Sequence, residues 1–203
     1  MHQLCIASAM VLFAVTSSAQ VSEPAQPVSM GIVVDTSGSM GTNMKLVRGL
    51  VAELVKSAGS ADEFALIQAS DRPVILSGFA GASDLASRIE FVSARGRTAL
   101  LDAVYLGSQI VRTGRNPRKV LFVISDGGEN SSRYTEGEIR ESLAQTRARV
   151  YTVATTGSES GAPELAFLRR LADEARGRFA AVDRSSDLAT VVRELSMAIS
   201  TGQ

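Results

Sequence analysis

Two segments of the chain carry apolar side chains at odd and even positions alike: VSMGIVVD, from Val28 to Asp35, and KVLFVIS, from Lys119 to Ser125. Successive side chains of a β-strand point to opposite faces of the sheet, so such a strand must be covered on both faces. Strands of this kind are typical of parallel sheets with a layer of helices on each side. The second run is the more continuous, and we expect it at the centre of the sheet.

Strand-like and helix-like segments alternate from Val28 to the end of the chain. Further strands are predicted at Phe64–Ala69, Pro73–Phe79, Arg149–Thr155 and Phe179–Val182, the second of them at an edge because it carries a proline. Apolar spacing predicts helices over residues 43–58, 83–89, 98–114 and 163–177. Capping signals predict two more helices, one that begins at the capping box of Thr135 and Glu138 and one that begins after Ser186. The predicted fold is α/β, with a doubly wound, mostly parallel six-stranded sheet and helices on both faces.

The first residues are interpreted as a targeting segment. An apolar stretch from Leu4 to Val15 is followed by small residues, which is typical of a signal peptide over residues 1–19. The alternative, a membrane anchor, needs about 20 apolar residues to span a bilayer, and this stretch is shorter. Residues 20–27 then form a linker with two prolines, and residues 28–203 form one domain. The chain is therefore expected to be exported, to the periplasm or the extracellular space, with no membrane span after cleavage.

Removal of residues 1–19 would also restrict the chemistry of the protein. His2 is the only histidine and Cys5 the only cysteine of the sequence, so the mature chain would have neither. A Ser-His-Asp triad, a cysteine nucleophile and a zinc site of imidazole or thiolate ligands are then excluded. A metal site would have to be built from oxygen ligands.

The charges are balanced, with 21 Lys and Arg against 21 Asp and Glu and no long run of one sign. Proteins that bind nucleic acid usually carry a basic patch that contacts the phosphates. We therefore expect no nucleic-acid partner.

Two of the predicted strands end in an aspartate followed by a turn that contains glycine: Asp35 in VVDTSGS, and Asp126 in VISDGGE. In doubly wound sheets, ligands bind outside the carboxyl ends of the strands, where the strand order reverses. If these two strands are neighbours there, both carboxylates face one crevice, together with the hydroxyls of Ser37 and Ser39. Mg²⁺ binds about six oxygen ligands and usually keeps some of its waters, so this set would suit it.

These residues resemble the metal-ion-dependent adhesion site of the von Willebrand factor type A domains. Asp35-x-Ser37-x-Ser39 matches the first element of that site, and GRTALLDAV, from Gly96 to Val104, is similar to the second, with Thr98 as its threonine. The segment VISDGGEN is similar to the third, with Asp126 as its aspartate. The resemblance extends from about Val28 to Ile199, and SDGGENSSR is similar to the form found in exported bacterial members.

The resemblance implies a protein-binding domain and no enzyme. It implies that Asp35, Ser37, Ser39, Thr98 and Asp126 hold Mg²⁺, or else Mn²⁺ or Ca²⁺, with the hydroxyls as direct ligands and the aspartates often acting through water. A partner protein would supply an acidic residue to the open position of the ion. Hydroxyl ligands are uncharged, so the cation would keep a positive charge that attracts such an acid. The resemblance implies nothing about the oligomeric state.

Three alternatives stay open. VVDTSGS is close to the Asp-Thr-Gly loop of aspartic proteases, but those enzymes need two such loops, and SDGG is not a second copy. A Mg²⁺-dependent phosphohydrolase would need a cation beside the aspartates to grip a phosphate, and the sequence places none there. A structural domain with an idle metal site is the third.

Several residues near the motifs admit a structural interpretation. Asp102 and Tyr105 are expected to support the fold, and Met40 and Met44 are expected to pack in the core. Glu129 and Asn130 flank the turn of Asp126, where they either fix its shape or contact a ligand.

Overall fold

The computed structural model describes residues 26–155, 162–183 and 188–201. Its six strands form one sheet in the order β3-β2-β1-β4-β5-β6. The strands are β1 (Val28–Asp35), β2 (Glu63–Ala69), β3 (Val74–Ala80), β4 (Arg118–Ser125), β5 (Arg149–Thr155) and β6 (Phe179–Val182). β3 runs antiparallel to β2, and the other pairings in the sheet are parallel. The predicted fold class is confirmed, including the edge position of β3 and the central position of β4.

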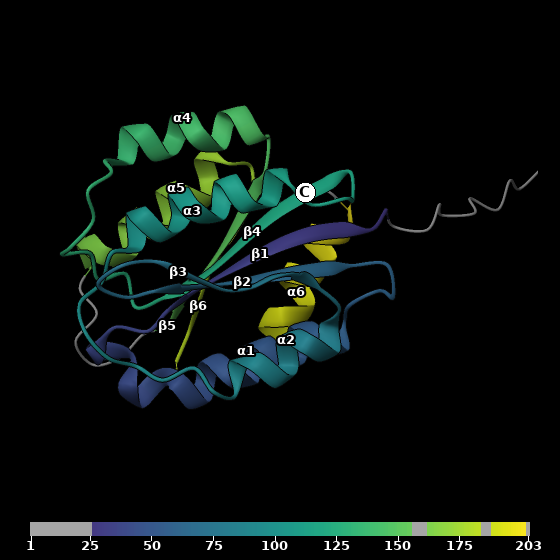
Figure 1. Ribbon diagram of the computed structural model, residues 1–203, viewed down its shortest axis with the longest axis horizontal. Helices are drawn as coiled ribbons and strands as arrows, with labels where there is room; N and C mark the ends of the chain where they lie inside the picture. The colour runs from purple at the N-terminus through teal and green to yellow at the C-terminus, as the bar shows by residue number, and fades with distance from the viewer. Residues whose placement is uncertain (1–25, 156–161, 184–187, 202–203) are drawn as a thin grey trace, which may run out of the picture.

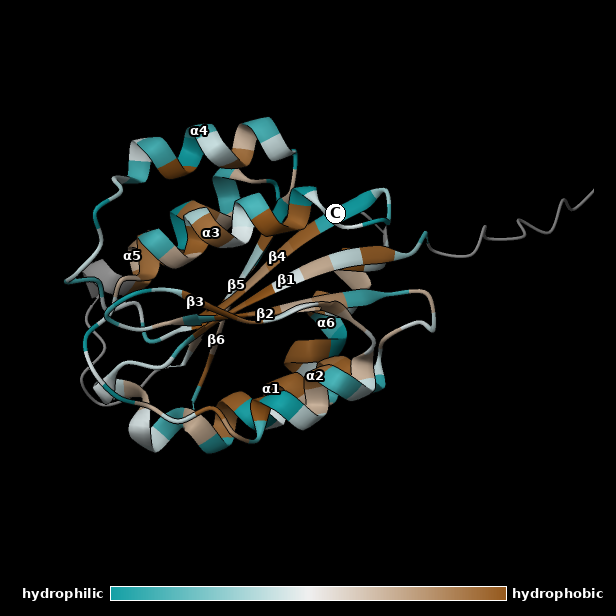
Figure 2. Cartoon of the chain, in the orientation of Figure 1, coloured by the Kyte–Doolittle hydropathy of each residue, from teal (hydrophilic) through white to brown (hydrophobic). Residues whose placement is uncertain are grey.

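Helices cover both faces of the sheet (Figure 1). Helices α1 (Met44–Lys56), α2 (Ala82–Ile89) and α6 (Leu188–Thr201) lie on one face, and α3 (Leu100–Arg112), α4 (Glu136–Thr146) and α5 (Ala162–Glu174) lie on the other. Their apolar sides are turned toward the sheet (Figure 2). β1 contributes side chains to the cores on both faces of the sheet. Ile32 and Val34 pack under α1 and α6, and Val33 packs under α3. The apolar residues at both parities of this strand thus fill two separate cores.

The strand order reverses between β1 and β4. From β1 the chain proceeds outward through β2 to β3, and it then crosses back through α3 to β4 on the other side of β1. β1 and β4 pair in register from Val28 and Arg118 to Val34 and Ile124. Asp35 and Ser125 therefore end adjacent strands, and the loops that follow them emerge side by side at one edge of the sheet.

The structure corrects two local predictions. α3 begins at Leu100, not at Thr98, because the backbone of Thr98 bonds with Asn130 while Ala99 accepts the first helical hydrogen bond, from Ala103. A short 3₁₀ helix, Gly38–Asn43, also precedes α1 where the sequence indicated only a loop. The capping box of Thr135 and Glu138 at the start of α4 is confirmed. The predicted signal peptide, most of the linker and the cap at Ser186 lie outside the described residues.

The described part of the chain contains no helix that combines the length and the apolar character needed to cross a bilayer.

Candidate metal centre

The carboxyl end of β1 places Asp35 at the base of the candidate site. Its side chain is fully buried, and both of its oxygens accept hydrogen bonds: Oδ1 from the Ser37 backbone at 2.9 Å, and Oδ2 from the Ser125 hydroxyl at 2.6 Å. The pKa of Asp35 is raised from 3.8 to about 6, with burial as the largest cause. Hydrogen bonds from Ser125 and Ser37 act in the opposite direction and lower the pKa, and the charge of Asp126 adds to the rise. A bound cation would favour the ionised carboxylate that burial disfavours.

The loop after β1 brings two hydroxyls together. Ser37 Oγ and Ser39 Oγ lie 3.0 Å apart, and Ser37 is 3 % exposed. Two neighbouring oxygens in an octahedral Mg²⁺ shell, each about 2.1 Å from the ion, lie about 3.0 Å from each other. The spacing of this pair therefore fits two adjacent ligands of one small cation.

Backbone hydrogen bonds hold the first loop against the second. Gly38 N donates to Gly96 O at 3.0 Å, and Arg95 N donates to Thr36 O at 2.6 Å. Gly96 has a φ of +79°, and a Cβ on it would lie 2.6 Å from Asp71 Oδ2, so any other residue would be strained in this turn. These contacts fix the position of Thr98, two residues further on.

The third loop carries Asp126 to the same place. Asp126 Oδ1 accepts from Gly128 N at 3.0 Å. A Cβ on Gly128 would lie 3.2 Å from that oxygen and 3.7 Å from Thr98 Oγ1, so the Thr98 hydroxyl and the Asp126 carboxylate both lie around this glycine. The charge of Asp126 also raises the pKa of Asp35, so the side chains of all three segments lie near one edge of the sheet.

Three residues that are not among the five predicted metal ligands shape the site. Ser125 is fully buried between Asp35, to which it donates, and Gly127 N, from which it accepts at 2.9 Å. Asn130 Oδ1 accepts from Thr98 N at 3.1 Å, and Asn130 N donates to Thr98 O at 3.1 Å. Glu129 Oε2 accepts from Leu101 N at 2.9 Å, which satisfies a free amide in the first turn of α3. Glu129 and Asn130 thus hold the second and third loops together.

The structural interpretations of the other flanking residues agree with the contacts. Asp102 is 4 % exposed and accepts from the backbones of Arg133 and Tyr134, and Tyr105 stacks on Tyr134 with ring centroids 4.0 Å apart. Met40 and Met44 are buried in the core.

Only two of the five candidate ligands carry a charge. Among the described residues, no three His, Cys, Asp or Glu side chains converge as a metal cluster, so any cation at this site would depend on hydroxyls as well as on two carboxylates. Oxygen atoms of this kind suit a hard cation such as Mg²⁺, Mn²⁺ or Ca²⁺. The residues therefore fit the type of ion that the sequence indicates.

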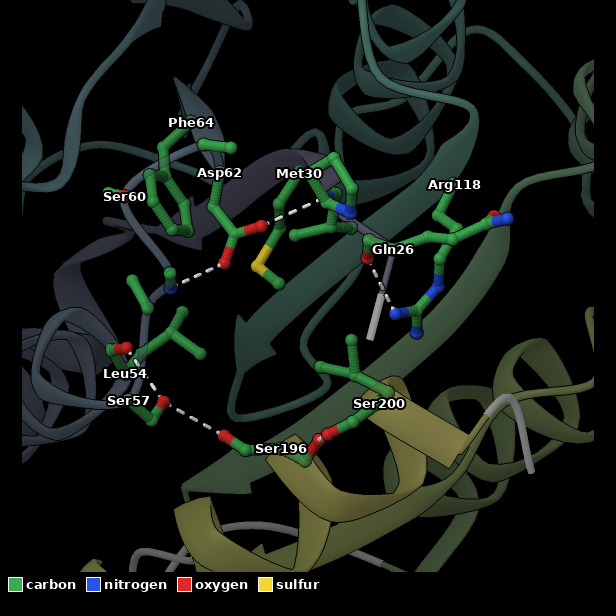
Figure 3. A pocket seen from close by; sticks show the side chains of 16 residues that line it. Gln26, Met30, Leu54, Ser57, Ser60, Asp62, Phe64, Arg118, Ser196 and Ser200 are labelled. Carbon is green, nitrogen blue, oxygen red and sulfur yellow. Dashed lines mark hydrogen bonds between the residues drawn. The ribbon is translucent and has the colours of Figure 1, made fainter. Parts of the chain in front are cut away.

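A separate hollow of about 400 Å³ lies at the opposite edge of the sheet, between α1 and α6 (Figure 3). Its carboxylate, Asp62, accepts from the backbones of Val28 and Gly59, and its guanidinium, on Arg118, donates to Gln26 O. Ser57 and Ser196 bond to each other across it. The polar groups named here are already paired, so the carboxyl edge of the sheet is the better candidate for a metal.

Comparison with known proteins identifies one matching family and many solved structures with the same fold. The von Willebrand factor type A domain family matches residues 30–194. No curated protein sequence matches the chain.

Among solved structures, an aerotolerance-related membrane protein from Bacteroides fragilis superposes with a TM-score of 0.71 at 15% identity, over 86% of this chain and 99% of that one. The conserved hypothetical protein BatB from Bacteroides thetaiotaomicron gives 0.69 at 15%, over 86% and 98%. The vWF domain of the type V pili tip protein Mfa5 from Porphyromonas gingivalis gives 0.66 at 12%, over 88% and 96%. At these identities the similarity shows a shared fold and nothing more.

Proposed function

Because this chain belongs to the von Willebrand factor type A domain family, we propose that it binds a protein partner through a divalent cation at the carboxyl edge of its sheet. The residues that would hold Mg²⁺, or Mn²⁺ or Ca²⁺, are Asp35, Ser37, Ser39, Thr98 and Asp126. The observation that carries the proposal is the gathering of these oxygen side chains, from three separate segments, around the ends of β1 and β4. When bound, the ion supplies a positive charge with a coordination position for the carboxylate of the partner.

The charge of the donor set supports this role. Two carboxylates and three hydroxyls neutralise a divalent cation less than a cluster of several acids would, and an incoming acid then gains more from binding. The amino end of α3 lies two residues beyond Thr98 and adds a favourable dipole on the same side.

The burial of Ser37 and Ser125 argues against a serine nucleophile at either position. Ser125 donates to the Asp35 carboxylate of raised pKa, but it is fully buried, and Ser37 is 3 % exposed. A serine nucleophile must reach a substrate, and neither hydroxyl is open to one.

The solved structures of the same fold include a pilus adhesin from Lactobacillus rhamnosus, the pilus tip protein Mfa5 and an aerotolerance-related membrane protein. By analogy we propose that this chain too acts outside the cytoplasm, in the periplasm or at the cell surface, with residues 1–19 as its signal peptide. The analogy rests on the fold and supports the kind of role, not the identity of the partner.

Affinity capture tests the proposal. The purified domain is immobilised and exposed to envelope extract or culture medium of the source cells, once with Mg²⁺ and once with EDTA. We expect a protein that is retained with Mg²⁺, released by EDTA, and not retained by the Ser39→Ala variant. Retention that is the same with EDTA, or the same in Ser39→Ala, contradicts a metal-dependent interaction.

A further inference from the structure

An open hollow of about 400 Å³ lies directly beside the loop of Asp126, on the side of α4 and α5. Leu101 and Phe167 form its apolar part, and each is only 9 % exposed. Glu136 and Arg170 line it as well, from the first turn of α4 and the middle of α5. The hollow therefore has an apolar part, with three charged residues, Glu129, Glu136 and Arg170, and the amide of Asn130 around it.

Two of the residues that line the hollow next to Asp126 are glycines. Gly127 and Gly128 follow Asp126 and line the hollow. Gly127 has a φ of +90°, which disfavours any other residue, and a Cβ on Gly128 would lie 3.2 Å from Asp126 Oδ1. The two glycines thus leave bare backbone between the hollow and the carboxylate of Asp126, and a chain that binds at the metal can continue into the hollow.

The charged groups around the hollow are already paired. Arg170 Nη2 lies 3.1 and 3.3 Å from the two carboxylate oxygens of Glu136. The Glu129 carboxylate accepts from Leu101 N, from the backbones of Ser131 and Ser132, and from the Ser132 hydroxyl. A second acidic group would find no unpaired cation among these residues. Leu101 and Phe167 have little exposed surface left, so an occupant gains mainly by removing its own apolar surface from water against them.

We propose that this hollow holds an uncharged apolar side chain of the partner, of the size of leucine, methionine or phenylalanine, from a residue next to the acid that binds the metal. The inference rests on the proposed function and names the chemistry of its partner: an acidic residue with an apolar neighbour. A side chain of this size fits within 400 Å³. Its burial strengthens binding by about tenfold to a hundredfold over alanine at the same place.

A displayed peptide library tests this inference. Each peptide carries one fixed aspartate with random residues on both sides, binds to the immobilised domain in Mg²⁺, and is eluted with EDTA. The wild type is compared with Arg170→Trp, which places an indole over the hollow. The matched control is Arg140→Trp, because Arg140 forms the same kind of exposed ion pair between α4 and α5, with Glu174 at 2.8 Å, but does not line the hollow.

We expect leucine, methionine or phenylalanine to be enriched next to the aspartate with the wild type and with Arg140→Trp, and this enrichment to disappear with Arg170→Trp. The inference is overturned if the wild type enriches no apolar neighbour, or if Arg170→Trp keeps the same preference. The rise of Tm with Mg²⁺ is measured on all three proteins. If the wild type shows no rise, the proposed metal site itself has failed; if it shows the rise but no apolar preference, only the hollow has failed.

Discussion

Ser125 donates its hydroxyl to Asp35 across the boundary between β4 and β1, at 2.6 Å, and both side chains are fully buried. The bond joins residues 90 positions apart, at the point where the strand order reverses. It is the largest of the hydrogen-bond contributions that lower the pKa of Asp35 against the effect of burial. Ser125 thus orients a carboxylate of the candidate metal centre without being one of the predicted ligands.

Replacement of Ser125 by alanine tests this role. The variant removes a hydrogen bond to a charged group and leaves Gly127 N without its acceptor, so we expect a loss of about 2–3 kcal/mol in the free energy of unfolding. Because ligand-orienting hydrogen bonds typically tune metal affinity by 10–100-fold, we expect Mg²⁺ to bind about tenfold more weakly. Chemical denaturation and calorimetric titration measure the two effects.

The control for this prediction is Ser108→Ala. Ser108 is also a fully buried serine, but it bonds to Tyr105 O and to Ser142, away from the metal centre. This variant should lose stability and keep its Mg²⁺ affinity. Equal effects of the two variants on Mg²⁺ affinity would show that Ser125 acts only through general stability.

The burial of Asp35 predicts a dependence of stability on pH when no metal is bound. Its pKa is about 6 in the folded protein and 3.8 when exposed, so the contribution of this group is fully present below pH 3.8 and is lost as the pH rises through 6. At 1.36 kcal/mol for each pH unit, the loss amounts to about 3 kcal/mol. Asp35→Asn removes the titration. In EDTA, we expect its free energy of unfolding, relative to wild type, to rise by roughly this amount between pH 4 and pH 7.5.

Denaturant unfolding of both proteins at several pH values in EDTA gives the comparison. A difference between wild type and Asp35→Asn that stays constant from pH 4 to pH 7.5 would contradict the raised pKa. Saturating Mg²⁺ should remove much of the dependence in the wild type, because the cation favours the ionised carboxylate.

The pair of hydrogen bonds between Asn130 and Thr98 predicts a positioning role for Asn130. Asn130→Ala loses the bond from Thr98 N, at 3.1 Å, but keeps the backbone bond to Thr98 O, so the loop is held at one point instead of two. Because the N–H of the buried Thr98 loses its acceptor, we expect the free energy of unfolding in EDTA to fall by about 1–2 kcal/mol. We expect Mg²⁺ affinity to fall about tenfold. Asn130→Asp keeps an acceptor for Thr98 N and should recover most of the affinity. If it binds Mg²⁺ no better than Asn130→Ala, the bond to Thr98 is not what matters.

Much of the fold follows from local patterns in the sequence. Val28–Asp35 and Lys119–Ser125 are apolar at both parities, which is enough to predict strands buried on both faces, and the aspartates after them mark the edge where the loops meet. The capping box of Thr135 and Glu138 acts within one turn, so its spacing is sufficient evidence for the start of α4. These features depend on neighbours a few residues away.

The features that the sequence did not predict depend on distant partners. Thr98 lies outside α3 because Asn130 engages its backbone from 32 residues away, and the role of Ser125 depends on a partner in another strand. The hydroxyl of Ser125 ends an apolar strand, which gives no sign of its use. Only the pairing of β1 with β4 brings it to Asp35.

A titration of the purified domain with divalent cations, followed by thermal unfolding, tests the central claim most directly. With Mg²⁺ or Mn²⁺ at about 100 times its Kd, binding adds about 2.7 kcal/mol to the free energy of unfolding, which for a domain of this size raises Tm by about 5–10 °C. We predict this rise in the wild type and its absence in Asp35→Ala and Ser39→Ala. A wild type whose Tm does not respond to Mg²⁺, Mn²⁺ or Ca²⁺, or variants that respond as the wild type does, would contradict the account.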